Sequence, residues 1–158
     1  MAKGGANKDF AKLRKELEEL EKLQVRIGFQ RGAALDDDGV DMVDIAMWNE
    51  LGTERNGKPH IPSRPFLRQS VDNNADKIKA FIKKELDGIG QTKTAKQVLQ
   101  KLGLRQKSLV QETINNGDFT KNKPATVARK KSAQPLVDSG QMLASVNFVI
   151  EEKGADSD

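Results

Sequence analysis

A chain of 158 residues fits one domain, and its composition is lean, with 36% hydrophobic, 4% aromatic and 32% charged residues. The absence of cysteine excludes disulfide frameworks, thiolate metal sites and cysteine nucleophiles, and no apolar run approaches the roughly 18–20 residues that cross a bilayer. The net charge of +4 is unevenly spread, because residues 91–131 hold ten basic against two acidic side chains while residues 151–158 hold four acidic and one basic.

The first predicted element is a helix over residues 8–23. Its apolar side chains recur at spacings of three and four and form one stripe, made of Phe10, Leu13, Leu17, Leu20 and Leu23. A single stripe on a terminal helix packs either on the protein's own core or on a neighbouring subunit. The alternation of apolar and other side chains over residues 25–29 then predicts a strand.

Residues 30–39 are predicted to form a loop, and the three aspartates at 36–38 do not fit the spacing of a calcium-binding loop. A short helix is expected over 41–51, with Asp41 as its N-cap and Trp48, the one tryptophan, anchored in the core. Residues 53–63 combine glycine and proline turn signals with no periodicity. They predict an exposed loop, or an arm that a partner orders.

The second half of the chain reads mainly as helix. Ser63 is a candidate N-cap for a helix that starts at Arg64-Pro65 and reaches residue 86, with a bend at Asn73-Asn74. Another helix covers 92–116, where a glycine at 103 weakens the middle. After a short helical turn from Pro124, residues 146–150 alternate as a second strand.

Together these elements predict an α+β fold in which a small, mostly antiparallel sheet is packed by several helices. The expected single domain has a core over 24–151, the N-terminal helix over 8–23 and a flexible acidic tail over 152–158. Two strands are too few for a stable sheet. Either further strands lie around 32–43, or neighbouring subunits complete the sheet.

Three patterns look chemical, and each departs from the arrangement that its chemistry needs. Residues 52–58 follow the glycine spacing of a phosphate-binding loop, but Pro59 replaces the magnesium-binding hydroxyl. Asp138, Glu151 and Lys153 have the spacing of a magnesium-dependent nuclease, yet Glu151 and Lys153 begin a polar tail. His60 is the one histidine and has no partner motif. We therefore expect no catalytic residue, no metal and no cofactor, and keep the nuclease as a minor alternative.

The basic segment is a candidate surface for DNA or for an acidic partner. Its charges could bind phosphates, although no base-reading motif accompanies them. The candidate residues are Lys93, Lys96, Lys101, Arg105, Lys107, Arg129 and Lys130. A DNA-binding accessory protein is thus a second functional reading, beside the simpler one of a solvated helix face.

Two parts of the chain carry a resemblance to a known group of proteins. The first runs from Asp44 to Thr53, ending in Asn49-Glu50-Leu51-Gly52-Thr53, and continues from His60 to Arg68, with Ile61-Pro62-Ser63-Arg64-Pro65-Phe66-Leu67-Arg68. The second runs from Pro124 to Lys131 and continues from Pro135 to Val146, with Pro135-Leu136-Val137-Asp138-Ser139-Gly140. In these stretches, which lie within about residues 25–150, the chain resembles virion morphogenesis proteins of tailed bacteriophages, of the neck and tail-completion type.

The resemblance implies a non-enzymatic virion component at the head–tail junction. Such proteins are α+β subunits of a ring, often sixfold, at the head-proximal end of the tail, where they end tube growth and allow head–tail joining. The implied partners are further copies of the chain, the tail tube protein, a head-completion or connector protein, and genome DNA in the lumen. The implied location is the virion, after assembly in the cytoplasm of the bacterial host.

If the chain forms such a ring, three regions are the expected contacts: the stripe of the N-terminal helix, residues 53–63 and the helix start at 64–68. Arg64 and Arg68 are candidates for ion pairs with a neighbour, because planar guanidinium groups suit carboxylates. The candidate interface residues are Leu13, Leu17, Leu20, Arg55, Lys58, His60, Ile61, Arg64, Phe66 and Arg68.

Overall fold

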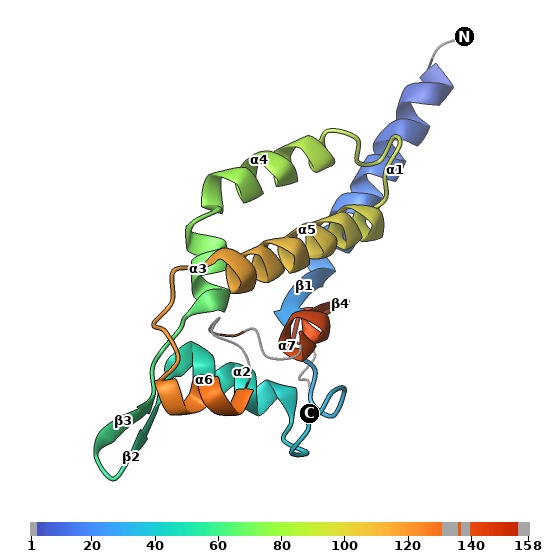
Figure 1. Cartoon of the computed structure of the whole chain (residues 1–158). Coiled ribbons are helices and arrows are strands. Elements are labelled where there is room, and N and C mark those ends of the chain that lie inside the picture. The colour runs from blue at the N-terminus through green and yellow to red at the C-terminus, as the bar shows by residue number, and fades with distance from the viewer. Residues whose placement is uncertain (1–2, 131–135, 137–139, 155–158) are drawn as a thin grey trace. The chain divides into compact units, whose positions relative to one another are not determined.

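The computed structural model describes residues 3–130, 136 and 140–154 (Figure 1). Seven helices and four strands lie in this part of the chain, and the predicted α+β class is confirmed. The chain divides into two compact units. Unit 1 comprises the described residues up to Ile27, those from Asn74 to Gln106 and those from Phe148 onward, and unit 2 comprises the described residues within 28–73 and 107–147.

Unit 1 combines helices with a two-stranded sheet. Its elements are α1 (Lys3–Lys22), β1 (Leu23–Gly28), α4 (Ala75–Leu86), the first half of α5 (Ala95–Asn116) and β4 (Asn147–Glu152). β1 pairs with β4, and beyond the strand ends the Lys153 N–H donates to the Lys22 carbonyl at 2.8 Å. In the part of the chain that the structure describes, this sheet has two strands, so the sequence correctly located both of its members.

Glycine at position 103 allows β4 to pack on α5. A Cβ atom there would lie 2.2 Å from the Phe148 ring, far inside van der Waals contact. The ring therefore occupies the space that a larger residue would fill. The buried side of α5 in this unit is formed by Ala95, Val98 and Leu99.

Two contacts hold α1 to the segment that begins α5. Gly90 has a φ of +75°, and its backbone approaches α1 so closely that a Cβ atom would lie 2.6 Å from the Cα atom of Leu13. One turn further along α1, the Glu16 carboxylate accepts the Ala95 N–H at 2.6 Å. This carboxylate satisfies one of the unpaired N–H groups at the start of α5. The C-terminal half of α1 is thereby fixed in unit 1.

Unit 2 contains the remaining elements, and the side chain of Phe66 lies in its core. They are α2 (Met42–Leu51), β2 (Thr53–Arg55), β3 (Lys58–Ile61), α3 (Phe66–Asp72), the second half of α5, α6 (Pro124–Lys130) and α7 (Gln141–Ser145). The Phe66 ring is fully buried and meets the Phe29 ring edge-on, with centroids 6.0 Å apart. Asp41 caps α2 as predicted, since its carboxylate accepts the Val43 N–H at 2.9 Å.

Residues 53–63 are mostly exposed, as predicted, but they do not form the loop that the sequence predicts. These residues form a β-hairpin in which β2 and β3 pair antiparallel around Asn56-Gly57 (Figure 1). Both turn residues have positive φ, at 54° and 69°, as the favoured two-residue hairpin turns require. The Asn-Gly pair was the available signal, and the lack of apolar alternation in the flanking strands concealed it.

Other expectations need smaller corrections. Trp48 is 40% exposed and does not anchor α2 in the core, because Met42 and Ala46 take the buried positions of that helix. Between residues 32 and 43 the chain forms an isolated bridge between Leu35 and Asp41, without a further strand. The bend at Asn73-Asn74 is confirmed as the break between α3 and α4.

Candidate subunit interface

Arg64 is a buried cation held by three neutral acceptors. Arg64 is only 5% exposed. Nε donates to the Thr120 carbonyl at 2.8 Å, Nη1 to Asn49 Oδ1 at 2.9 Å and Nη2 to Asn122 Oδ1 at 2.9 Å. Burial lowers the pKa of Arg64, although a guanidinium stays protonated in proteins. The planar group thus joins the end of α2, the start of α3 and the segment after α5.

Glu50 supplies the cap of α3 that the sequence assigned to Ser63. Its carboxylate accepts the N–H groups of Leu67 at 2.8 Å and Arg68 at 3.1 Å. Ser63 makes no cap; its hydroxyl donates to the Glu50 carbonyl at 2.9 Å. A carboxylate at the positive end of a helix is favourable, so Glu50 stabilises α3 from the neighbouring helix α2.

Gly52 completes the connection between these segments. Its φ is +78°, and a Cβ atom there would lie 2.9 Å from the backbone nitrogen of Ser63. Only glycine allows this close approach without a backbone shift. We call the set Asn49, Glu50, Gly52, Ser63 and Arg64 the Arg64 joint. It unites the two motif stretches at 49–53 and 61–68 into one hydrogen-bonded unit.

Two of the predicted contact residues, Arg64 and Phe66, are buried inside the subunit. Arg64 was expected to form an ion pair with a neighbour, but its donors go to acceptors of its own chain. Phe66 was expected at an interface, but it is fully buried in unit 2. The sequence could not reveal this, because a buried and an exposed arginine at a helix start have the same local pattern.

The hairpin carries candidate residues that stay accessible. Arg55, Lys58 and His60 are exposed, and Ile61 is half-buried. A shallow pocket on its surface is lined by Arg55, Asn56, Lys58, Pro59 and His60. The hairpin extends away from the ends of α2 and α3, and the Arg64 joint fixes its base (Figure 1). Arg68, on the next helix, is exposed as well.

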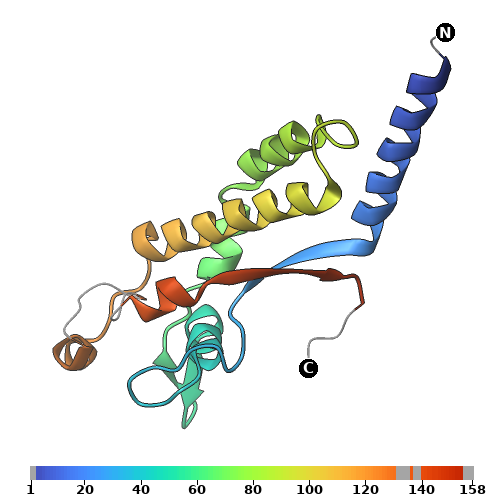
Figure 2. The same cartoon turned by 90° about the vertical axis from the view of Figure 1, so that its right-hand side faces the viewer.

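The stripe of α1 is largely uncovered. Phe10 is 67% exposed and Leu17 49% exposed, while Leu13 and Leu20 are half-buried. A shallow, mostly apolar pocket lies on this helix, lined by Phe10, Leu13, Arg14, Leu17, Glu18 and Glu21. The first turns of α1 extend past the other elements of unit 1 (Figure 2). The sequence allowed this stripe to pack either on the protein's own core or on a neighbouring subunit. Packing on the core covers only part of it, because Phe10 and Leu17 remain exposed.

A second exposed apolar face, which the sequence pattern did not predict, lies on α2. On α2, Met47, Trp48 and Leu51 are each at least 40% exposed. The signal was present, because α2 is apolar on nearly all sides and one helix cannot bury every side in a small unit. Exposed apolar side chains gathered on one short helix are typical of a contact surface.

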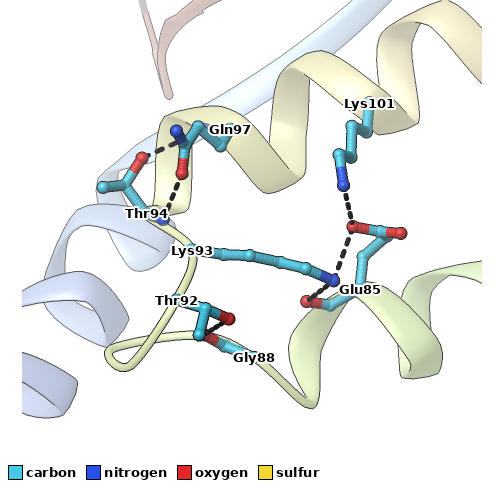
Figure 3. Close-up of polar contacts among 7 residues, drawn as sticks. All are labelled: Glu85, Gly88, Thr92, Lys93, Thr94, Gln97 and Lys101. Atoms are coloured by element: carbon cyan, nitrogen blue, oxygen red, sulfur yellow. Dashed lines mark hydrogen bonds and ion pairs between the residues drawn. The ribbon is translucent and has the colours of Figure 1, made fainter.

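The basic candidates are only partly available for a partner. Glu85 is buried, and its carboxylate binds Lys93 at 2.8 Å and Lys101 at 3.0 Å (Figure 3). The hydrogen bond from Lys93, followed by that from Lys101, lowers the pKa of Glu85. Lys96 lies 3.9 Å from Glu19 of α1. Lys93 and Lys101 therefore share one buried carboxylate, which compensates part of their charge, and the Lys101 side chain stays 50% exposed.

The other basic candidates do not establish one surface. Arg105 belongs to unit 1 and Lys107 to unit 2, and both are half-buried. The side chains of Arg129 and Lys130 lie outside the described residues. Among the described residues, the basic side chains of the segment are therefore not shown to form one DNA-binding face.

The chemical alternatives find little support in the geometry. Residues 52–58 belong to the hairpin and open no helix, unlike a phosphate-binding loop. Glu151 accepts hydrogen bonds from Arg26 at 2.7 Å and Gln24 at 3.0 Å, and Arg26 lowers the pKa of this carboxyl. Asp138 lies outside the described residues. Among residues 3–130, 136 and 140–154, no group of three or more histidine, aspartate or glutamate side chains is placed to hold a metal ion.

Comparison with known proteins adds no relative to this description. The chain matches no family model, no curated protein and no solved structure. None of the described helices is both long and apolar enough to cross a membrane.

The candidate interface consists of three exposed regions: the hairpin, the outer stripe of α1 and the outer face of α2.

Proposed function

We propose that this protein is a non-enzymatic structural subunit of a tailed-bacteriophage virion, which assembles into a ring at the head-proximal end of the tail. In this role it ends growth of the tail tube and provides the surface on which the head is joined. Its partners are further copies of itself, the tail tube protein and a head-completion or connector protein. The proposal rests on the motif resemblance and on the use that the fold makes of the motif residues.

The Arg64 joint is the observation that carries the proposal. The motif residues Asn49 and Arg64 bind each other, Glu50 caps α3, and Gly52 lies against the backbone of Ser63. Residues used in this way serve to hold a shape, as a scaffold protein requires. The shape that they hold is the base of an exposed hairpin, which suits a contact arm in an assembly.

Uncovered apolar surface in both units supports the same proposal. Phe10 and Leu17 are exposed in unit 1, and Trp48 and Leu51 in unit 2. Soluble monomers rarely expose large apolar patches without an interaction that covers them. A subunit whose neighbours lie on several sides explains exposed apolar faces in separate parts of the chain.

Deletion of the gene from the phage tests this function directly. We expect no infectious particles, and electron micrographs of the lysate should contain separate heads and tails. Overlong tails would identify a terminator, and tails of normal length without heads would identify a completion factor. Complete, infectious particles in the absence of the protein would refute the proposal.

Binding to duplex DNA separates the alternative function. An accessory DNA-binding protein would bind tightly at low salt and lose affinity steeply as salt rises. We expect weak binding, because Lys93 and Lys101 are engaged by Glu85. Cleavage of the same DNA in the presence of magnesium would instead favour the nuclease, and Glu151→Ala would then abolish it.

A further inference from the structure

The charges of α1 divide sharply along its length. Residues 8–15 hold four basic side chains and one acidic one, and residues 16–22 hold four acidic side chains and one basic one. The basic side chains of the first half are Lys8, Lys12, Arg14 and Lys15, and the acidic ones of the second half are Glu16, Glu18, Glu19 and Glu21. The exposed part of the apolar stripe, from Phe10 to Leu17, crosses the boundary.

This order of charges does not favour the isolated helix. The dipole of a helix favours acidic residues in its first turn and basic residues in its last turn, and the last turn of α1 holds Glu19 and Glu21 beside the favourable Lys22. The first turn of α1 has no acidic residue. Arg14 and Glu18 form an ion pair at 2.8 Å, but with the basic residue first, which is the weaker order. Interactions within the helix therefore do not explain this charge pattern, and contacts with other segments or other molecules have to be considered.

The rest of the chain accounts for only part of the acidic half. Glu16 binds the backbone of Ala95, and Glu19 lies near Lys96. Within the described residues, Glu21 has no hydrogen bond or ion pair, and the same holds for Lys8, Lys12 and Lys15. Apart from Arg14, which pairs with Glu18, the basic side chains are thus left without acidic partners, at the end of α1 that projects from unit 1 (Figure 2).

We propose that α1 pairs antiparallel with α1 of a second copy of this chain. Antiparallel pairing sets the basic half of each helix against the acidic half of the other, and it also aligns the two helix dipoles favourably. If the crossing is centred between Leu13 and Leu17, Leu13 of each copy lies opposite Leu17 of the other, and Phe10 opposite Leu20. The pairing covers the exposed stripe and is the same for both copies, as a two-fold contact requires.

A parallel pair is disfavoured, because it would place basic half against basic half. The contact goes beyond the proposed ring and does not rest on it, since neighbours in a ring meet through two different surfaces. In solution the α1 pair joins two copies of any assembly that the other surfaces form. If the protein is otherwise monomeric, the pair makes a dimer, and if it forms rings, the pair stacks two rings.

Charge reversal in three variants tests the pairing. One variant reverses the basic half with Lys12→Glu and Arg14→Glu, the second reverses the acidic half with Glu18→Lys and Glu21→Lys, and the third combines all four changes. Sedimentation velocity over a range of protein concentrations measures the size of the assembly. We expect each half-reversed variant to associate at least about tenfold more weakly than wild type and to sediment as half its size. The combined variant should recover the wild-type size.

The matched control is Lys83→Glu with Lys84→Glu on exposed positions of α4, which gives the same charge change as reversal of the basic half. It should leave the size unchanged. Recovery in the combined variant also shows that the reversed helices fold, as circular dichroism should confirm. Mass-tagged combined variant and wild type should not mix, because an antiparallel pair between them places like charges together.

Three results would overturn the pairing. The first is a wild type of the same size as both half-reversed variants at every concentration. The second is a combined variant that stays as small as its half-reversed parents. The third is ready mixing of the combined variant with wild type, which would indicate parallel helices. None of these results bears on whether the gene is needed for virion assembly, so the two proposals can fail separately.

Discussion

The Arg64 joint and the outer face of α1 use similar side chains in opposite ways. In the joint, a guanidinium and a carboxylate find all their partners inside unit 2. On α1, Phe10 and Leu17 face solvent and Lys8, Lys12 and Lys15 have no partner among the described residues. Arg64 in the joint and the stripe of α1 were both predicted to make partner contacts, yet Arg64 binds acceptors of its own chain. Of these two regions, only α1 keeps an uncovered binding surface.

This difference separates residues that stabilise the subunit from residues that are available to bind a partner. A residue that closes a network inside a subunit is needed for the fold, and its substitution lowers the free energy of unfolding. A residue on an uncovered face affects association and leaves the folded subunit intact. Five substitutions test whether the comparison holds, beginning with the largest expected effect.

Substitution of Arg64 should produce the largest loss of stability. Arg64→Lys removes the planar group that binds three acceptors and leaves at least one of them unpaired in the interior. We expect the free energy of unfolding to fall by about 3 kcal/mol in chemical denaturation. The control Arg68→Lys, at an exposed position, should change it by less than about 0.5 kcal/mol. Equal effects of the two changes would contradict the structural role of Arg64.

Substitution of Gly90 tests the seat of α1 in unit 1. Gly90→Ala introduces a Cβ atom 2.6 Å from the Leu13 backbone at a φ of +75°, so both strain and a clash oppose it. We expect a loss of about 2 kcal/mol in thermal or chemical unfolding. Gly39→Ala is the matched control, because its φ is +80° with no atom within 4 Å, and it should cost only about 1 kcal/mol.

Substitution of Gly103 should have a smaller effect of mixed origin. Gly103→Ala gains about 1 kcal/mol of helix propensity but places a Cβ atom against the Phe148 ring. We expect a net loss of about 1 kcal/mol, measured by chemical denaturation. Addition of Phe148→Leu should remove part of that loss by making room. A stabilised Gly103→Ala variant would show that the ring moves away freely.

Glu85 should make stability depend on pH. Its pKa is lowered in the folded protein by the hydrogen bonds from Lys93 and Lys101, so its contribution is present above the ordinary carboxyl value near 4.5 and is lost as pH falls through the lowered value. Glu85→Gln should therefore be less stable than wild type at pH 7, and the difference should shrink at pH 3. Denaturation of both proteins at the two pH values measures this. A constant difference would argue against an ionised Glu85.

Phe10 should have the smallest effect on the folded subunit. Phe10→Ser changes a side chain that is 67% exposed, so we expect the free energy of unfolding to change by less than about 0.5 kcal/mol. Self-association measured by sedimentation should weaken at the same time. A large loss of stability without a change in association would place Phe10 in the subunit's own core and reverse the comparison.

The sequence predicted the elements with strong periodic patterns and failed where partners are distant. The helices around residues 8–23, 41–51 and 92–116 and both strands of the β1–β4 sheet agree with the structure, because their apolar spacing is a local property. The hairpin at 53–61 was not predicted, since its strands lack apolar alternation and the Asn-Gly turn was its one local signal. The cap of α3 was misassigned, because Glu50 lies 17 positions before Leu67, whose N–H it accepts.

The candidate site shows the same division. The sequence by itself determined the lean composition, the stripe and split charge of α1 and the exposed hairpin residues, because each depends on the order of residues along a short segment. Only the tertiary structure decided that Arg64 and Phe66 are buried, that Glu85 engages Lys93 and Lys101, and that Phe10 and Leu17 stay uncovered. Burial and pairing depend on segments far apart in the chain, and a local pattern contains no record of them.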